Sequence, residues 1–474
     1  MASRRPHRAA GPPGWIALLT VALSLSGAIC GSDGDRPAAP RAGDTITVWI
    51  LESQPERVRA TRRNVARFTE RSGIGVRVVP IGDDELAARM ERARATRRVP
   101  DVAQLPVASL HAYSRDGILD ATAAADVIDR LGDRTFSQTA LSLVSRDGQP
   151  AGVPSDGWGQ LLIYRKDLFD RAGLPAPRTL EDISRAARRL DRGGMAGITL
   201  ATAPADNFTA QTFEHVAMAA GCELVDDAGR VQLTSPRCRR AFRYYTGLAR
   251  RYSAGGVQDV DSTRDRYFAG RAAMVFWSPF LLDAMAGLRD DAVPTCRECR
   301  RDRGYLARNS GLVGVLSSAA GGAGTQFGEL SSWGIAPGDG ARVDAAKRFV
   351  EYMLSDGYLR WLALSPQGKY PARPGDTSDP ERYARGWARL QSGVDRKAPL
   401  RRFYSQAAID ALGEGVRRVQ RWGFPQGQAA LVGALRGPQP VTRALAAAVS
   451  GMAGPGAAAR RAQAAVERIR AKVR

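Results

Sequence analysis

The chain has 474 residues, of which 44% are hydrophobic and 25% are charged, a balance that is ordinary for a soluble globular protein with two or three domains. Its formal net charge of +21 would suit a nucleic-acid-binding protein, but the arginines are spread along the chain, often beside Asp or Glu, and no arginine–aromatic module of the RNA-binding type occurs. We therefore expect no nucleic-acid partner.

An export signal is predicted at the N-terminus. Three arginines precede an apolar run, Trp15 to Leu25, that is too short to span a bilayer comfortably, and no other run is long enough to cross a membrane. Small residues and then Cys30 follow, an arrangement similar to a bacterial lipoprotein signal, although Ile29 departs from the usual small residue before the lipidated cysteine. We expect residues 1–29 to be a signal peptide and residues 30–43 to be a flexible tether.

The first ordered part of the chain alternates strands and helices. Short β-branched runs are each followed by a helical pattern, and Gly73 has the position of a residue that ends a helix. Such alternation predicts a parallel sheet with helices on its faces. The strands are expected over 46–50, 76–80 and 100–104, and the helices over 56–71, 83–96 and 107–115.

The stretch from Gly152 to Leu168 is unusual. Ser155-Asp156-Gly157 predicts a turn, and a strand is expected over 160–164. Trp158 would then lie at the tip, between two glycines and near a carboxylate. An indole in that position could stack on the C–H face of a sugar ring whose hydroxyls pair with the acid. The alternative is a tryptophan folded back onto its own domain.

The rest of the chain continues the mixture of helices and strands. Thr179 to Asp182 is a capping signature for a helix through Leu190, and Pro236 fits the first turn of another helix. The basic tail, Gly456 to Arg474, predicts a helix with a solvated face, and contact with an anionic membrane surface is the weaker alternative. Further helices are expected over 207–220, 235–252, 343–354 and 357–364, and further strands over 198–200, 272–277 and 330–335.

Four cysteines remain if Cys30 carries the anchor, and an even number in an exported chain predicts disulfides. Three pairings are open, and we favour the two local ones, Cys222–Cys238 and Cys296–Cys299. A four-cysteine zinc site and a redox role for the single CxxC motif are the alternatives, and both fit less well because the compartment is oxidising and no strand-to-helix turn surrounds the motif.

Several segments together resemble the extracellular solute-binding proteins of bacterial ABC importers, in the carbohydrate-binding group similar to the maltose-binding protein. The resemblance implies an α/β, two-lobed periplasmic-binding-protein type II fold, each lobe a mostly parallel sheet flanked by helices, with a ligand cleft between the lobes. The segments are the leader, 46–68, 152–183, 267–282 and 331–373. The implied domains are lobe 1, 44–156 and 313–371, and lobe 2, 157–312 and 372–474 with its C-terminal helices, with crossings near 152–156, 309–315 and 370–373.

Ligand-binding residues follow from the resemblance position by position. Phe280 matches the place where maltose-type proteins put a stacking tryptophan after Gly-Pro, but here the motif is Ser278-Pro279-Phe280 with Trp277 before it. The full set of expected ligand-binding residues is Asp156, Trp158, Trp277, Phe280, Trp333, Tyr370, Arg373, Gln104, Ser53, Asn207, Phe208 and Gln211.

The resemblance also implies partners: a sugar or oligosaccharide, the permease subunits in the membrane, and possible anchoring by an N-terminal lipid, for a monomer without cofactor or metal. A binding protein for a peptide, polyamine or phosphodiester is the alternative. An enzyme is less favoured, because only His7, His111 and His215 occur and no convincing carboxylate pair for glycoside hydrolysis stands out.

Overall fold

Parallel strands begin the described part of the chain, as the strand–helix alternation predicts. In this computed structural model the described residues are 45–82, 85–146, 148–322 and 324–473. The predicted signal peptide, the tether and Cys30 lie outside them. The strands β1 (Thr45–Ile50), β2 (Gly75–Pro80) and β3 (Val102–Pro106) pair in parallel and alternate with the helices α1 (Pro55–Ser72), α2 (Leu86–Ala95) and α3 (Val107–Arg115).

Strands from distant parts of the chain complete this first sheet. They are β6 (Val153–Gly159), β10 (Gln326–Ile335), β11 (Tyr370–Pro371) and β12 (Val419–Gln420). The order is β11-β6-β10-β3-β1-β2, with β12 beside β10. The pairs β3–β10, β10–β6 and β6–β11 are antiparallel, so the parallel character of this sheet is confined to β1, β2, β3 and the short β10–β12 pair.

A second sheet has the order β8-β7-β9, and its three strands, β8 (Met274–Trp277), β7 (Leu161–Arg165) and β9 (Ser310–Val313), pair antiparallel. Thr199 adds a single parallel bridge to Val275. The chain passes from the first sheet to the second at Gln160, between β6 and β7, and returns between Val313 and Gln326. These two passages bring β6 and β10 side by side along the first sheet.

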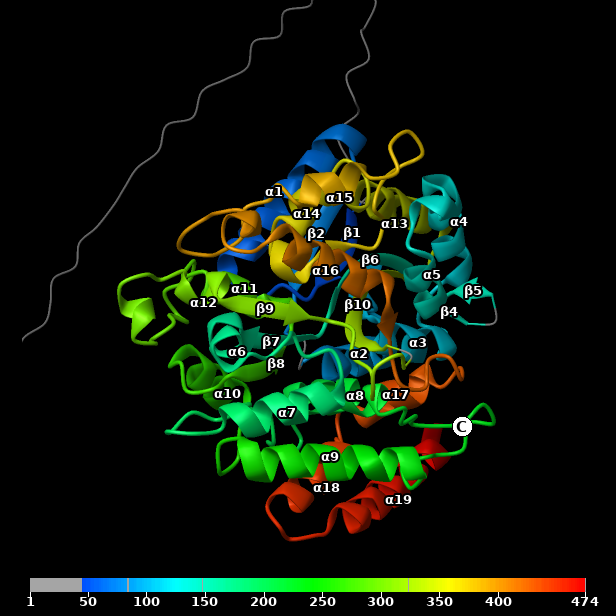
Figure 1. Cartoon of the computed structure of the whole chain (residues 1–474). Helices are drawn as coiled ribbons and strands as arrows, with labels where there is room; N and C mark the ends of the chain where they lie inside the picture. The colour runs from blue at the N-terminus through cyan, green and yellow to red at the C-terminus, as the bar shows by residue number, and fades with distance from the viewer. Residues whose placement is uncertain (1–44, 83–84, 147, 323, 474) are drawn as a thin grey trace, which may run out of the picture. The chain divides into compact units, whose positions relative to one another are not determined.

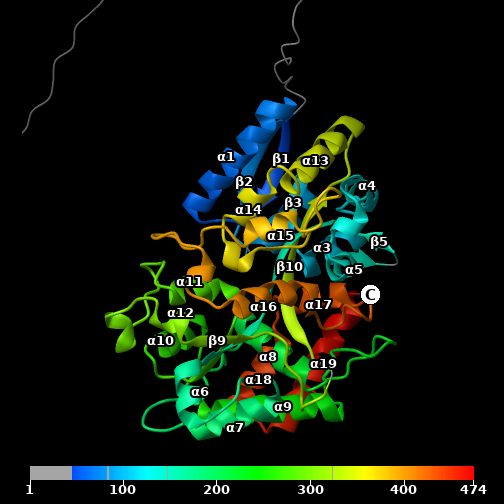
Figure 2. The ribbon, with the colours of Figure 1, turned by 45° about the horizontal axis from the view of Figure 1, so that its top comes forward.

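Helices cover both sheets (Figures 1 and 2). The capping box predicted at Thr179 and Asp182 is present, and Pro236 begins its helix as predicted. The remaining helices are α4 (Ala121–Leu131), α5 (Gln138–Val144), α6 (Lys166–Ala172), α7 (Leu180–Leu190), α8 (Asn207–Ala219), α9 (Pro236–Tyr252), α10 (Val260–Phe268), α11 (Leu282–Met285), α12 (Tyr305–Arg308), α13 (Gly340–Met353), α14 (Tyr358–Leu362), α15 (Arg382–Trp387), α16 (Gln406–Arg417), α17 (Ala429–Leu435), α18 (Pro440–Val449) and α19 (Pro455–Val473). A short hairpin joins β4 (Ser145–Arg146) to β5 (Gln149–Pro150).

Both predicted disulfides form. Cys222–Cys238 ties the segment after α8 to the first turn of α9, and Cys296–Cys299 closes a short loop. The local pairing is therefore confirmed over the two alternatives.

The predicted turn at Ser155-Asp156-Gly157 is wrong, because these residues lie inside the continuous strand β6. Gly157 pairs with Leu330 on one side and with Tyr370 on the other. A Cβ at Gly157 would lie 2.7 Å from the carbonyl oxygen of Glu329, so the glycine permits close approach of β10 and does not mark a turn.

Substituting Gly157 with alanine is expected to destabilise the protein. The new methyl group must push β10 away, and overpacking of this kind costs about 1–3 kcal/mol. Gly247 is the matched control, because it lies within α9 with nothing within 4 Å of its Cβ position, and Gly247→Ala should raise stability by about 0.5–1 kcal/mol. Urea unfolding of the two variants measures both effects. A neutral Gly157→Ala would contradict the close packing of β6 on β10.

Candidate functional site

A cavity of about 290 Å³ lies where β1, β3, β6 and β10 meet the first turns of α8. Its polar lining comes from the ends of strands and from loops, and its apolar lining is dominated by two aromatic rings. The lining residues are Leu51, Glu52, Gln104, Pro106, Asp156, Gly157, Trp158, Asn207, Gln211, Phe280, Glu329, Leu330, Ser331, Gly368, Lys369 and Arg436.

Trp158 and Phe280 form the aromatic wall of the cavity. Both side chains are half-buried, their ring centroids are 6.3 Å apart, and their planes meet at 78°. Phe327 supports the indole from behind, at 5.9 Å between centroids. Gly368 lets Phe280 lie where it does, since a Cβ there would be 2.0 Å from the phenyl ring. Two partly exposed rings are thus held by their packing.

Buried Lys369 joins two carboxylates at the floor of the cavity. Its Nζ lies 2.8 Å from Glu52 Oε1 and 3.3 Å from Asp156 Oδ1, and 4.3 Å from the centroid of the Trp361 ring. Asp156 Oδ2 also accepts hydrogen bonds from Ser155 Oγ and Trp361 Nε1, each at 2.7 Å. We call Glu52, Asp156 and Lys369 the floor cluster.

The charges of the floor cluster stabilise one another. Burial alone would lower the pKa of Lys369, but Asp156 and Glu52 outweigh it and the pKa is raised. Burial would likewise raise the pKa of Glu52, yet Lys369 and Arg57 hold it below its ordinary value. Glu52 and Lys369 are therefore charged at neutral pH in spite of being buried.

A second buried ion cluster lies beside the cavity. Arg421 places Nη1 2.7 Å from Glu329 Oε2 and Nε 3.1 Å from Glu214 Oε1, and its guanidinium lies 4.7 Å from the centroid of the Phe327 ring. Burial raises the pKa of Glu214 against the attraction of Arg421. Only Glu329 of these residues lines the cavity, so the guanidinium positions a carboxylate on the wall.

Amide side chains supply the remaining polar lining. Gln104 donates from Nε2 to Ser331 Oγ at 3.0 Å and accepts from the backbone N–H of Leu51 at 2.9 Å, so its orientation is fixed. Asn207 and Gln211 are one turn apart on α8 and face the cavity together. Both can donate and accept hydrogen bonds, as a hydroxyl-rich ligand requires.

Half of the residues expected to bind ligand line this cavity, namely Gln104, Asp156, Trp158, Asn207, Gln211 and Phe280. The other six do not line it. Ser53 is exposed outside it. Trp277 and Phe208 pack on each other at 4.5 Å, and Tyr370 packs on Trp387 at 4.8 Å. A ligand in the cavity is therefore separated from these rings.

The expectation that Trp333 and Arg373 face the ligand is not met. Trp333 is fully buried and packs at 5.1 Å on Trp361, the ring over which Lys369 lies. Arg373 is also buried, and it donates hydrogen bonds to the carbonyl oxygens of Leu131 and Leu354. Its guanidinium therefore binds backbone carbonyl oxygens inside the protein and does not point toward the cavity.

Sequence reasoning missed Glu52, Glu329, Lys369 and Arg436 in the lining. Glu52 directly precedes the expected Ser53, and Lys369 directly precedes the expected Tyr370. Because neighbouring side chains of extended backbone point to opposite sides, an error of one residue exchanges a cavity residue for one that points away. The end of a parallel strand correctly indicates a ligand-binding position here, but the prediction places it at Ser53, one residue after Glu52.

The described residues contain no group of three or more His, Cys, Asp or Glu side chains placed to hold a metal ion. Within the same ranges, no helix combines the length and the apolar character needed to cross a bilayer.

Comparison with known proteins gives a consistent result. The sequence model of a family described as "Bacterial extracellular solute-binding protein" matches residues 64–388. The chain is 26% identical over 337 residues to the "Putative ABC transporter periplasmic-binding protein YcjN" of Escherichia coli (strain K12), covering 69% of this chain and 73% of that protein.

Solved structures show the same fold. Maltose-bound MalE3 of T. maritima superposes with a TM-score of 0.66 at 18% identity, covering 89% of this chain and 99% of that one. UgpB of Mycobacterium tuberculosis, in complex with glycerophosphocholine, superposes with a TM-score of 0.66 at 16% identity, covering 92% and 99%. The predicted two-lobed fold of the periplasmic-binding-protein type is confirmed.

Removing the cation of the floor cluster is expected to be costly. Lys369→Met leaves two buried carboxylates without their shared partner, and breaking a buried pair in this way costs about 3–5 kcal/mol. Lys347 is the control, since its Nζ also lies near two carboxylates, at 2.9 Å from Asp344 and 3.2 Å from Asp126, but both are solvent-accessible. Lys347→Met should cost less than about 1 kcal/mol. Urea unfolding measures the free energy of unfolding of both variants. Similar losses of this free energy would contradict the importance of the floor cluster.

Asp283 supports the cavity wall from behind and predicts a pH effect. It accepts a hydrogen bond from Gln367 Nε2 at 2.8 Å, and burial raises its pKa to about 6 against the attraction of Arg289. Between pH 3.8 and about 6, the folded state therefore holds a proton that the unfolded chain has released. Above about pH 6 the ionised carboxyl group destabilises the folded state. This loss of stability disappears as the pH falls toward 3.8. Asp283→Asn should be more stable than the natural chain by roughly 2–3 kcal/mol at about pH 7. The gain should disappear in acid, and a gain that does not depend on pH would contradict the raised pKa.

Proposed function

The chain belongs to the family of bacterial extracellular solute-binding proteins, and we propose that it captures a neutral sugar or short oligosaccharide for a membrane permease of the ABC importer class. The ligand would bind in the 290 Å³ cavity. We also propose that Cys30, which lies outside the described residues, carries a lipid that holds the protein at the outer face of the membrane.

The arrangement of Trp158 and Phe280 beside fixed polar groups carries this proposal. Each ring offers apolar area to the C–H face of a pyranose, while carboxylate and amide oxygens of Asp156, Glu52 and Gln104 lie along the same cavity. Ligand sites of this kind are mostly apolar and carry a few well-placed polar groups. A sugar ring, apolar on its faces and polar at its edge, matches that distribution.

The charges near the cavity favour a ligand without net charge. Lys369 is held by Glu52 and Asp156, and Arg421 by Glu329 and Glu214. An anionic ligand would have to compete with these buried carboxylates for either cation. Hydroxyl groups, in contrast, can donate to carboxylate oxygens without disturbing the ion pairs.

A cationic head group is the second candidate. Aromatic faces next to carboxylates also suit a quaternary ammonium group through cation–π attraction, and Trp158 lies beside Phe280 and near Glu329. UgpB, whose structure is similar, holds glycerophosphocholine. The phosphate of such a ligand would need a cation. Lys369 is engaged with two carboxylates, so the phosphate would depend on Arg436, the other cation of the lining, and we rank this candidate second.

We assign no catalytic role to the cavity carboxylates. Glu52 and Asp156 are the closest candidates for a pair that hydrolyses glycosides, but both are ion-paired to the same lysine. A general acid needs a proton at neutral pH, whereas Lys369 and Arg57 hold the pKa of Glu52 below its ordinary value.

Trp158→Ala is expected to weaken sugar binding at least about tenfold, because the ring is half-exposed and supplies one face of the site. The melting temperature should change little. Trp49→Ala is the control, since Trp49 is also half-buried but lies on β1 away from the cavity lining, and it should keep the affinity. Calorimetric titration with mono- and disaccharides, glycerophosphocholine and choline measures the affinities.

Three outcomes of this titration would contradict the proposal. Binding of choline compounds without sugars would favour the second candidate. Slow turnover of a glycoside during the titration would indicate an enzyme. A large fall in melting temperature for Trp158→Ala, with sugar affinity retained, would show that the ring belongs to the core.

A further inference from the structure

One surface of the protein is rich in arginines. Helix α9 carries six exposed arginines and no acidic residue. Its neighbour α19 adds Arg460, Arg461, Arg468 and Lys472, all exposed, against the single acidic residue Glu467. The α9 residues are Arg237, Arg239, Arg240, Arg243, Arg250 and Arg251.

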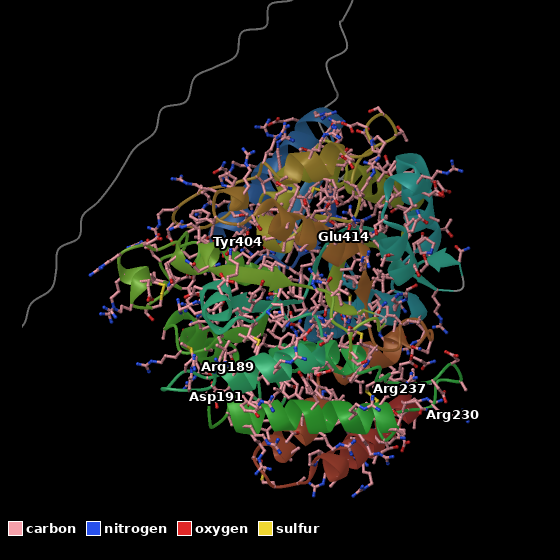
Figure 3. The ribbon with its side chains drawn as sticks, viewed as in Figure 1. Arg189, Asp191, Arg230, Arg237, Tyr404 and Glu414 are labelled. Carbon is pink, nitrogen blue, oxygen red and sulfur yellow. A yellow bond between two sulfur atoms is a disulfide. The ribbon has the colours of Figure 1, made fainter. Side chains whose placement is uncertain are left out.

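A third helix extends this surface. The C-terminal half of α7 exposes Arg188 and Arg189, and Arg192 follows shortly after its end. Helix α9 contacts both α7 and α19, and Figures 1 and 2 show the three helices side by side together with α18. Figure 3 labels Arg189 on α7 and Arg237 on α9. We call Arg188, Arg189 and Arg192, together with the exposed cations of α9 and α19, the arginine face.

The cations of the arginine face have no ion-pair partner within 4.0 Å among the described residues, unlike many arginines elsewhere and unlike Arg185 of α7, which pairs with Glu181 and Asp182. Arg342, for comparison, makes a two-pronged contact with Asp101 at 3.0 Å. So many like charges without partners repel one another and do not stabilise the fold. A surface of this kind is expected to bind an anionic partner.

Exposed apolar side chains occur close in sequence to two helices of the arginine face. Among the described residues, Val257, Val260 and Met452 are the large hydrophobic side chains that are exposed, at 66%, 41% and 75%. Val257 lies in the segment that joins α9 to α10, and Val260 is the first residue of α10. Met452 lies in the turn between α18 and α19, next to Gly451, whose Cβ position is 3.9 Å from the guanidinium of Arg250.

We propose that the arginine face docks on the surface of an anionic phospholipid bilayer. The guanidinium groups would bind headgroup phosphates, and Met452 with the two valines would enter the boundary between headgroups and acyl chains. Each arginine near such a surface contributes about 1 kcal/mol, and apolar side chains beside the charges add to the binding. This inference rests on the arginine face and not on the identity of the ligand.

A membrane suits this face better than a nucleic acid does. Binding of single strands relies on exposed aromatic rings between the cations, but the tyrosines of α9, at positions 244, 245 and 252, are buried or half-buried. Exposed valines and a methionine have no role in a phosphate groove. They do have one at the boundary of a bilayer.

The test uses residues 30–474 with Cys30→Ser, so that no lipid contributes, and vesicles of phosphatidylcholine with or without phosphatidylglycerol. The charge-reversal variant Arg239→Glu, Arg243→Glu, Arg250→Glu changes one side of α9. The control Arg59→Glu, Arg62→Glu, Arg63→Glu makes the same change in net charge with exposed arginines of α1. Vesicle sedimentation gives the partition coefficient of each protein.

The protein with its arginine face unchanged should bind vesicles that contain phosphatidylglycerol, and this binding should weaken as the salt concentration rises. The α9 variant should partition about 100-fold more weakly, as expected from three arginines at about 1 kcal/mol each, and the α1 control should change by less than about threefold. Met452→Asp should also weaken partition without altering the circular dichroism spectrum. If the α9 reversal unfolds the protein, the Arg→Gln version of the same three changes carries the test.

Several results would overturn the proposal. An equal fall in the partition coefficients of the α9 and α1 variants would mean that the net charge of the protein alone determines its binding to vesicles. Equal binding to vesicles without phosphatidylglycerol would exclude recognition of anionic lipid. Displacement of the protein from vesicles by an equal charge concentration of single-stranded RNA would favour a nucleic acid. None of these measurements needs a sugar, so they are independent of the ligand assignment.

Discussion

The buried ammonium group of Lys369 is the interaction on which the cavity depends. It joins the end of β1, the strand β6 and the segment before β11, three parts of the chain that are far apart in sequence. A buried cation is tolerated only when opposite charges and hydrogen bonds replace its water. Glu52, Asp156 and the face of Trp361 replace it here. Each group is in place only if the others are, so the floor of the cavity is fixed as a unit.

This constraint also shapes what the cavity offers a ligand. The second cluster repeats the pattern, with Arg421 between Glu329 and Glu214 and a phenyl ring beside the guanidinium. In both clusters one cation engages two carboxylates and an aromatic ring. Lys369 and Arg421 are thereby engaged by the protein itself, whereas three carboxylates and one further cation, Arg436, line the cavity. The site accordingly presents acceptors and rings, which is the chemistry from which we infer a hydroxyl-rich ligand.

Local signals in the sequence were sufficient for most of the fold. The alternation from β1 to α3, the capping box at Thr179 and the two disulfides each depend on residues close together in the chain, and all were predicted. Gly157 shows where local reasoning fails. Its meaning is set by Glu329, a strand neighbour far along the chain, and a glycine that permits close packing looks the same in sequence as one that permits a turn.

The same limit explains the site residues. Tryptophans beside Ser, Gly or Pro are expected in the cavity, but Trp333 is covered by Trp361, which no local pattern links to it. The pairing of charges differs in the same way between the interior and the surface of the protein. Inside the protein, Lys369 and Arg421 are matched to carboxylates, because burial of either cation without a partner would be prohibitive. On α9 water solvates the arginines, so the fold does not require partners for them. Selection for folding therefore does not account for six arginines on one exposed helix, and a partner outside the chain is the simpler physical explanation.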